Sequence, residues 1–368
     1  MADENENEEV SEIVETEETK AQTLEKGKKF TQILGASICM LGGFTLGLGI
    51  GWSSPADSIN KGLNKSANGT NSDYVDIINQ MHWVGSLYNV GAMLVMFPIG
   101  FVLDIVGRKI TMLIIAPCAS ASFVLLAALH KLPAWIVGRI LLGFFSAAFC
   151  VAAPIYVAEI SEASIRGTLG VFFQLLLVMG ITVEFALGKA NDVRILGYVS
   201  AAFPILFFIA FIFVPESPKF HIMKGKTDSA KKALQWYRGK KCDVTAELAV
   251  MEHTVEEALE SKSSFKELFS TRAARRSLGM AAILMIFQQL SGINILMFYA
   301  SKIFSDAGSK LSDIDSSIIL AVVQIFWDSN IYFHCGQSWE KDFVVCFAFW
   351  DVYFLDMHGW MANISGKR

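Results

Sequence analysis

The sequence predicts an all-α membrane protein, and two observations lead to that fold class. Of the 368 residues, 53% are hydrophobic and only 18% are charged, and the mean hydropathy is +0.44. Ordinary soluble domains carry about 25% charged residues, so long stretches of this chain need not face water. A helix needs about 20 apolar residues to cross the hydrocarbon core of a bilayer, and the chain holds several apolar runs of that length.

The apolar runs predict seven membrane-spanning helices, and an eighth begins near Ile318. The seven spans are Ile33–Gly51, Trp83–Leu103, Ile110–Leu129, Trp135–Val157, Leu169–Gly188, Leu196–Val214 and Leu278–Ala300. The six cysteines are scattered without the CxxC spacing of a metal or redox site, so neither a metal nor a cofactor is implied. The net charge of −4 gives no basic excess for binding nucleic acid.

The chain begins with a polar segment, residues 1–29, which holds ten acidic residues and four lysines. Such a low hydrophobicity and high charge predict a disordered tail. The segment lacks the apolar core of a cleavable signal peptide. We therefore expect the first span to act as the insertion signal.

The placement of Lys and Arg near the spans predicts the orientation of the chain. If the N-terminus is cytoplasmic, twenty Lys and Arg lie on the cytoplasmic side and seven on the other side. The outer loop 52–81 then carries two glycosylation sequons, at Asn64 and Asn68. The sequence thus predicts a multi-pass plasma-membrane protein with a cytoplasmic N-terminus.

A polar insert, residues 215–276, follows the sixth span and shows helix signals over 228–237 and 244–259. It separates an N-terminal six-helix half (30–214) from the start of a second half (277–326). Two halves joined by a charged cytoplasmic linker are typical of secondary transporters. Since no HExxH or GxSxG motif and no paired intramembrane carboxylates occur, the chain is not expected to be an enzyme.

Charged residues cluster at the predicted cytoplasmic ends of the spans. Because a charged side chain in a membrane costs free energy, each of them is a candidate for a functional role. Opposite charges there can hold helix ends together in one state and part in another, so the set predicts a cytoplasmic gate. The alternative is that they only fix the topology. The candidate gate residues are Asp104, Gly107, Arg108, Lys109, Glu159, Arg166 and Glu216.

Seven motifs, in order, resemble those of the sugar porter family of the major facilitator superfamily, and most closely its trehalose and glucose facilitators. They are Gly-Trp-Ser-Ser-Pro-Ala (51–56), Asp104–Lys109, Gly138-Arg139, Pro154–Glu159, Arg166-Gly167, Pro215–Pro218 and Gln288–Asn294. The resemblance covers about residues 30–326. It implies a bundle of twelve helices in two halves, of which this chain holds a complete first half and a partial second half, about seven or eight helices in all. Arg139 is a further charge inside a span.

The resemblance also implies a sugar site at the midplane between the halves. A neutral polyol needs groups that donate and accept hydrogen bonds without charge, and amides do both. Four amides match sugar-contacting positions of the family, with two aromatic residues that close over the sugar and Gly292 allowing local unwinding. These residues are Gln174, Gln288, Gln289, Asn294, Phe298 and Tyr299. The alternatives are interhelical amide contacts and an aromatic interface belt.

Coupling to protons requires a titratable group near the sugar site. Proton-coupled relatives carry an acid where Gly49 stands, and the first span holds no Asp or Glu. The sequence therefore predicts facilitated uniport, with proton symport as the alternative. Glu184 in the fifth span is the remaining acid. It lies toward the outer end, where Lys189 or Arg194 is available to neutralise it, and no role is assigned to it.

Beyond Phe326 the sequence stops resembling the family. Residues 327–368 hold eleven aromatics, about twice the proportion in the whole chain, and Asp328 interrupts the eighth span. We interpret this segment as an aberrant tail that leaves the second half incomplete, which predicts impaired transport. The alternatives are a divergent interfacial tail and a non-transporting sugar sensor or decoy. The expected partners are a small sugar and the lipid bilayer. Neither the choice of sugar nor the oligomeric state is predicted.

Overall fold

The computed structural model describes residues 29–66, 78–239, 242–260, 272–306 and 312–335, and all regular secondary structure in these ranges is helical. The elements are α2 (Lys29–Gly51), α3 (Ser53–Ser66), α5 (Met81–Val106), α6 (Arg108–Ala128), α7 (Leu132–Ile160), α8 (Ala163–Leu187), the 3-10 turn η1 (Gly188–Ala190), α9 (Val193–Ile212), α10 (Pro218–Met223), α11 (Thr227–Arg238), α12 (Thr245–Glu260), α13 (Arg272–Leu290), α14 (Ile293–Asp306) and α15 (Asp313–Cys335). Residues 1–28 of the predicted tail 1–29 lie outside the described residues, as does Asn68, whereas Lys29 begins α2 and Asn64 lies near the end of α3.

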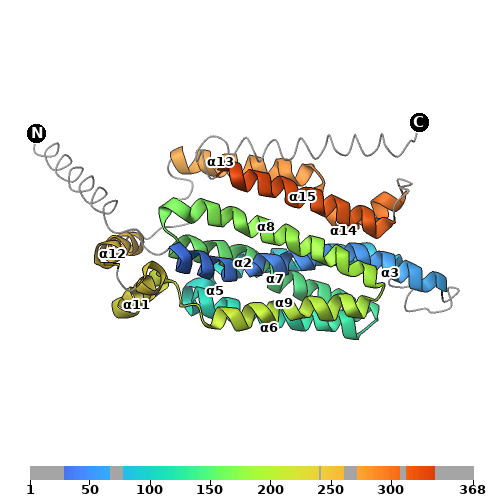
Figure 1. The fold of residues 1–368 in the computed structure, drawn as a ribbon, viewed down its shortest axis with the longest axis horizontal. Coiled ribbons are helices and arrows are strands. Elements are labelled where there is room, and N and C mark those ends of the chain that lie inside the picture. Colours follow the sequence, from blue (N-terminus) through green and yellow to red (C-terminus); the bar gives the residue numbers. More distant parts are fainter. Residues whose placement is uncertain (1–28, 67–77, 240–241, 261–271, 307–311, 336–368) are drawn as a thin grey trace, which may run out of the picture.

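Helices α2 and α5–α9 pack into one bundle, with α3 continuing α2 and η1 continuing α8 at one end, and we call all of these the six-helix unit (Figure 1). Within it α2 packs on α8, α5 on α7, and α6 on both α7 and α9. Phe149, Phe207 and Phe211 are fully buried; the Phe207 ring meets Phe149 edge to face and stacks on Phe211, with ring centroids 5.0 Å apart in each pair. This bundle corresponds to the predicted N-terminal half.

Glycines allow two of these helix pairs to approach closely. A Cβ on Gly47 of α2 would lie 1.9 Å from the carbonyl oxygen of Leu177 in α8. A Cβ on Gly143 of α7 would lie 2.0 Å from the carbonyl oxygen of Tyr88 in α5. Because lipid gives helices no hydrophobic reason to associate, such close backbone contact is a main source of packing energy in a membrane.

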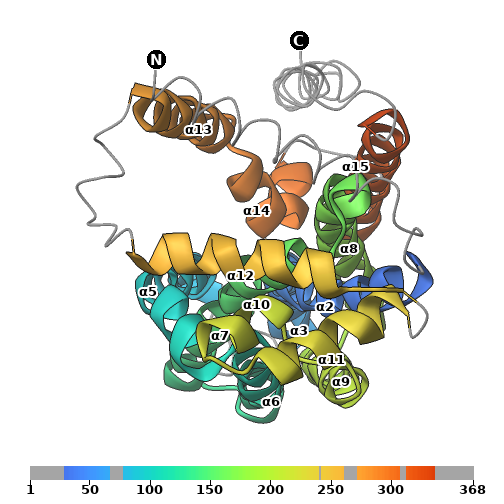
Figure 2. The same ribbon diagram turned by 90° about the vertical axis from the view of Figure 1, so that its left-hand side faces the viewer.

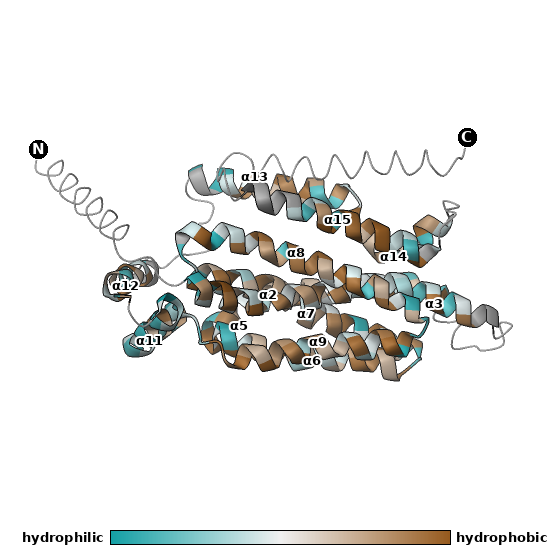
Figure 3. Ribbon diagram, in the orientation of Figure 1, coloured by the Kyte–Doolittle hydropathy of each residue, from teal (hydrophilic) through white to brown (hydrophobic). Residues whose placement is uncertain are grey.

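The helices of the six-helix unit are largely hydrophobic (Figure 3), and many of their large apolar side chains are exposed. On α5, the side chains of Phe97 and Phe101 are 82% and 75% exposed. Among the described residues, seven helical segments are long and apolar enough to cross a membrane. These segments contain or closely overlap the seven predicted spans, so the prediction of an all-α membrane protein is confirmed.

Helices α13, α14 and α15 form a second group, which we call the second unit and which lies along one side of the six-helix unit (Figure 2). α15 packs along α8, and α14 packs against α3. Helices α10–α12 lie together at one end of the six-helix unit, which we call the linker end; α3 marks the opposite end. Two of them, α11 and α12, match the helices predicted in the polar insert.

The eighth helix differs from the prediction. α15 runs without a break through Phe326 and Asp328 to Cys335. The Asp328 side chain is only 5% exposed, so it lies in the protein interior and not against lipid, and it does not end the helix. The remainder of the predicted tail, residues 336–368, lies outside the described residues.

Candidate functional site

Arg108 and Glu159 form a buried ion pair at the linker end of the six-helix unit. Arg108 begins α6 and Glu159 lies at the end of α7, and Nη2 of Arg108 is 3.0 Å from Oε1 of Glu159. Their side chains are 6% and 9% exposed. Ser217 donates its hydroxyl to Oε2 of Glu159 at 2.5 Å, and Asp104 lies 3.1 Å from Arg108. Together with Glu216 we call these residues the linker-end cluster.

Glu216 closes the turn between α5 and α6. Its carboxylate accepts the backbone N–H of Lys109 with both oxygens, at 3.0 and 2.9 Å, and the N–H of Ser217 at 2.9 Å. Burial raises the pKa of Glu216, while these two N–H donors and Arg108 act in the opposite direction. Gly107 has φ of 108°, and a Cβ there would lie 2.6 Å from Oε2 of Glu216. Only glycine fits this turn beside the carboxylate.

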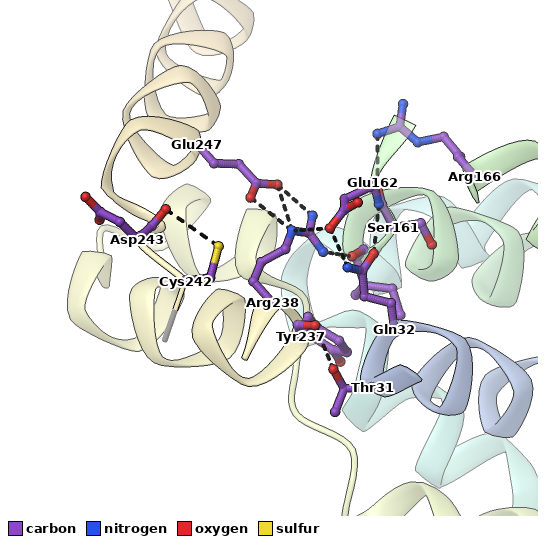
Figure 4. Close-up of polar contacts among 11 residues, drawn as sticks. Thr31, Gln32, Ser161, Glu162, Arg166, Tyr237, Arg238, Cys242, Asp243 and Glu247 are labelled. Atoms are coloured by element: carbon purple, nitrogen blue, oxygen red, sulfur yellow. Dashed lines mark hydrogen bonds and ion pairs between the residues drawn. The ribbon is translucent and has the colours of Figure 1, made fainter. Parts of the chain in front are cut away.

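Two of the predicted gate residues use other partners. The Lys109 ammonium donates to the carbonyl oxygen of Ile212 at 2.8 Å, so its side chain ties α6 to α9. Arg166 is exposed, and its guanidinium donates to the carbonyl oxygen of Ser161 at 3.3 Å (Figure 4). The structure therefore brings together Asp104, Arg108, Glu159 and Glu216, while Arg166 lies beside the α7–α8 turn.

Arg139 on α7 is a fully buried cation near the α3 end. Its guanidinium donates to the carbonyl oxygen of Gly49 at 2.7 Å, to Ser53 Oγ at 2.8 Å and to the carbonyl oxygen of Val84 at 3.2 Å. It also lies 4.6 Å from the centre of the Tyr88 ring, within the range of a cation–π contact. Arg139 thus joins α7 to α2, α3 and α5.

The predicted amides of the second unit lie at a break between two helices. α13 ends at Leu290 and α14 begins at Ile293, with Gly292 at φ of 74°. Across this break Nδ2 of Asn294 donates to Oε1 of Gln289 at 2.9 Å. These residues are five apart, a spacing that a straight helix does not place on one stripe. The break therefore lets the two amides meet.

The other two amides are placed differently. Gln288 is half-buried, and its backbone carbonyl oxygen, not its side-chain amide, accepts the Ser291 hydroxyl at 2.6 Å. Gln174 lies on α8 in the six-helix unit and is exposed. Among the described residues, no hydrogen bond links Gln174 to Gln289 or Asn294.

The two predicted aromatic residues connect α14 to α5. Phe298 is buried, and its ring centre lies 5.9 Å from that of Tyr88. Tyr299 donates its hydroxyl to the carbonyl oxygen of His82 at 3.1 Å. The backbone leaves helical geometry at Tyr299, with φ of −126° and ψ of 23°, so α14 is kinked there.

Comparison with known proteins decides the family. A family model described as "Sugar (and other) transporter" matches residues 35–328. The chain belongs to the sugar transporter family. This sugar transporter chain is 34% identical over 297 residues to the facilitated trehalose transporter Tret1 of Aedes aegypti, and 33% identical over 297 residues to that of Culex quinquefasciatus. Each match covers 80% of the chain, but only 36% and 56% of the two relatives.

Solved structures show the same fold. The partially occluded inward-open conformation of the xylose transporter XylE from E. coli aligns with a TM-score of 0.66, covering 84% of this transporter chain and 74% of XylE at 20% identity. XylE bound to 6-bromo-6-deoxy-D-glucose aligns with a TM-score of 0.69 at the same identity, covering 84% of this chain and 70% of XylE. The predicted major facilitator fold, with a six-helix half and a partial second half, is confirmed.

The sequence did not single out several residues that anchor the linker helices of the transporter chain (Figure 4). Arg238 at the end of α11 donates to both carboxylate oxygens of Glu247 at 2.6–3.2 Å, and to the carbonyl oxygen of Ile160 at 2.9 Å. Gln32 of α2 and Glu162 exchange two hydrogen bonds at 2.6 and 3.1 Å. The one sequence signal is that Glu247 follows Arg238 by nine residues in the polar insert.

Tyrosines make a second anchor of the linker helices. The hydroxyls of Tyr156 in α7 and Tyr237 in α11 are hydrogen-bonded to each other at 2.6 Å, and both lie within hydrogen-bond distance of the carbonyl oxygen of Pro215. Thr31 in α2 donates to the carbonyl oxygen of Tyr237 at 2.7 Å. The pKa of Tyr237 is raised, chiefly by burial, which keeps its hydroxyl protonated as a donor.

Glu184 is not neutralised as the sequence analysis expected. Its carboxyl is fully buried and accepts the Ser200 hydroxyl at 2.6 Å. Lys189, the expected partner, instead lies 2.7 Å from Asp315 of α15. The expectation failed because α8 turns Glu184 into the six-helix unit, whereas Lys189 lies in the 3-10 turn beyond the helix end.

Proposed function

We propose that this chain takes part in facilitated, gradient-driven transport of a sugar such as trehalose or glucose across a membrane. The observation that carries the proposal is the hydrogen-bonded pair of amides, Gln289 and Asn294, at the α13–α14 break. Both side chains are exposed, so they can exchange their mutual bond for bonds to a polyol. The relatives named as facilitated trehalose transporters supply the substrate class.

The proposed cycle is alternating access, in which the two units rock around the sugar site. In this reading the linker-end cluster is a gate that holds the ends of α5–α7 and the start of α10 in one arrangement. Gln288 and Gln174 contribute further amides from two units, and Phe298 and Tyr299 cover the site from the α3 end. Because the chain spans 36% and 56% of two relatives, the complete cycle of those proteins is itself part of the proposal.

We infer the orientation from charge. Lys and Arg concentrate on the side of the linker end, which favours a cytoplasmic location for that end and for the N-terminus. The α3 end then faces outward, with Asn64 and Asn68 as the proposed glycosylation sites in a plasma membrane. If the α3 end faces outward, removing the two sequons removes the attached glycans and lowers the apparent mass of the expressed chain. If that end faces the cytoplasm, the apparent mass stays the same.

Uniport is supported by the surroundings of Arg139. Its three hydrogen-bond partners are two backbone carbonyl oxygens and one hydroxyl, and none of these groups titrates in the physiological range. Gly49, which contributes one of the carbonyl oxygens, stands where proton-coupled relatives carry an acid. The groups that bond the cation therefore keep their charge through the cycle, and Glu184, the acid near enough to act on Arg139, is hydrogen-bonded to Ser200 instead.

The first test measures sugar binding and uptake by the purified chain. We expect trehalose or glucose to raise its thermal stability in detergent, and Gln289→Leu or Asn294→Leu to weaken that effect about tenfold in sugar concentration, because one or two hydrogen bonds to the sugar are lost. Uptake into liposomes should fall in parallel. The matched control is Gln80→Leu, an exposed amide next to the start of α5. Equal sugar responses in all variants would contradict the proposal.

A second candidate, proton-coupled transport, is favoured by one observation. Glu184 is fully buried, and its Oε1 has no hydrogen-bond partner among the described residues. Such a carboxyl can exchange a proton for a partner when helices move. Under an inward proton gradient we expect sugar only to equilibrate across liposomes, in both the native chain and Glu184→Gln. Sugar accumulation that Glu184→Gln abolishes would establish the second candidate.

A further inference from the structure

Two buried polar side chains lie one helical turn apart on α15. Gln324 and Asp328 are only 3% and 5% exposed. Their spacing of four residues places them on the same face of the helix, and that face also carries the buried Leu320 and Ala321. The interior face of α15 therefore changes from apolar to polar after Ala321.

Each of the two side chains holds an oxygen atom that lacks a hydrogen-bond partner. Oε1 of Gln324 and Oδ2 of Asp328 are both buried from solvent, and neither is paired with any group among the described residues. An amide oxygen and an ionised carboxylate only accept hydrogen bonds, so the two groups cannot satisfy each other. Leaving such acceptors unpaired in the interior is costly. The pair therefore calls for a third group, one that carries positive charge or donates hydrogens.

The negative charge of the Asp328 carboxylate favours a positive third group. Lys189 pairs with Asp315 in the first turn of α15, and no ion pair in the described part of the chain includes Asp328. A buried carboxylate persists in a protein when it is paired with a cation or binds a metal ion. A single positive charge is enough to neutralise it.

The facing helix, α8, offers a further oxygen at the same level. α15 starts beside the end of α8, where a Cβ on Gly188 would lie 3.7 Å from Ile314, and it packs along α8 in the opposite direction (Figure 1). Asp328 follows Ile314 by 14 residues, and Gln174 precedes Gly188 by the same number. Because both helices rise by the same amount per residue, Gln174 reaches the level of Asp328. It also shares a face of α8 with Ile181, which belongs to the apolar cluster formed with α14 and α15.

We propose that Gln324 and Asp328 bind one monovalent alkali cation between α15 and α8, with Gln174 placed to contribute from α8 and water completing the shell. Hard cations take oxygen ligands, and these side chains offer one carboxylate and two amide oxygens. A divalent ion would leave an excess positive charge in a buried site, whereas a monovalent ion leaves none. The bound cation joins the second unit to the six-helix unit. The site goes beyond the proposed transport function and does not depend on it.

Thermal unfolding of the detergent-solubilised chain without sugar tests the site, with Na⁺ as the probe. We expect about 100 mM Na⁺ to raise the melting temperature by about 3 °C over the same concentration of N-methylglucamine, because an ion that binds only the folded chain stabilises it. Radioactive Na⁺ should bind saturably, at about one ion per chain. Gln324→Leu removes one ligand and should weaken this binding about tenfold.

Asp328→Asn keeps the shape of the side chain and removes its charge, so it should abolish the response to Na⁺. Without Na⁺ this variant should melt no lower than the native chain, because it also removes an uncompensated buried charge. That second measurement separates loss of the site from misfolding. The matched control is Asp315→Asn, which removes an exposed acid from the same helix and should keep the Na⁺ response.

Three outcomes overturn the proposal. An equal shift with N-methylglucamine would show an effect of ionic strength, and a Na⁺ response retained in Asp328→Asn would place the ion elsewhere. A native chain that is stabilised by acidification and not by Na⁺ would show that a proton, shared by Asp328 and Gln324, occupies the position. Since sugar is absent throughout, these outcomes leave the proposed transport function untouched, and a chain that fails to transport can still show the cation site.

Discussion

Replacement of Glu159 by alanine is expected to lower the free energy of unfolding of this chain by about 3 kcal/mol. Removing one partner of a buried ion pair costs about 3–5 kcal/mol, because the other charge stays buried. In this variant Arg108, which is only 6% exposed, keeps its ion pair with Asp104. The Asp104 side chain is 58% exposed and therefore in contact with solvent. That remaining partner places the expectation at the lower end of the range. Denaturant titration of the detergent-solubilised chain measures the change.

Two matched variants identify the source of the loss. Replacing Arg108 by Met and Glu159 by Leu together removes both charges and is expected to restore most of the stability, because no uncompensated charge remains. Asp104→Ala removes an exposed partner of the same arginine and should cost less than about 1 kcal/mol. If the double variant is as unstable as Glu159→Ala, lost packing and not the ion pair accounts for the effect.

The membrane-spanning helices were predictable because a bilayer demands long apolar runs. The predicted span Trp83–Leu103 corresponds to α5, Met81–Val106, and Ile33–Gly51 corresponds to α2, Lys29–Gly51. The helices exceed the predictions by a few residues because hydrogen bonding continues into the polar interface after the apolar run ends. Hydropathy locates the part of a helix that lipid requires, and it contains no information on the helical residues beyond that part.

The same reasoning failed at Asp328, for a physical reason. An acidic residue interrupts a span only if it would face lipid, and in the structure this side chain is buried. Whether a side chain faces lipid or protein depends on the neighbouring helix, here α8, which lies more than a hundred residues away in the sequence. A membrane-spanning helix that packs against a neighbouring helix can therefore contain a charged residue. Hydropathy alone would place the end of the helix at that residue.

The site was predictable where short motifs hold the interacting residues and less so elsewhere. Gly107, Arg108 and Lys109 form one motif, so their common location at the linker end followed from the sequence. The meeting of Tyr156 with Tyr237 joins residues 81 apart, one in the Pro154–Glu159 motif and one in the polar insert. No periodicity reports such a pair, because its partners are selected by the packing of α11 on the bundle.

The molecule uses different interactions at its two ends. At the linker end, the Arg108–Glu159 ion pair lies within the six-helix unit, and both of its charges are buried. At the α3 end, the contacts between Ser54 and Ser301 and between Lys189 and Asp315 join different units. Breaking the first set leaves a buried charge, whereas breaking the second set only exchanges hydroxyls and exposed ions for water. The second set is therefore the easier one to open.

Arg139→Ala is expected to lower the free energy of unfolding by about 4 kcal/mol, at least as much as Glu159→Ala does. It should lower the melting temperature by about 10 °C. The guanidinium donates to Gly49 in the last turn of α2, where the helix dipole favours a cation, and to Ser53 at the start of α3. Truncation leaves both oxygens and the Val84 carbonyl without this donor, and it opens a cavity between the Trp52 and Tyr88 rings.

Arg139→Lys separates the charge from the geometry of the guanidinium. Lysine keeps the positive charge near the end of α2, but its compact ammonium cannot reach three acceptors on three helices as the planar guanidinium does. We expect it to recover less than half of the stability lost in Arg139→Ala, as measured by thermal unfolding in detergent. Full recovery by lysine would show that charge alone stabilises the α2–α3 junction.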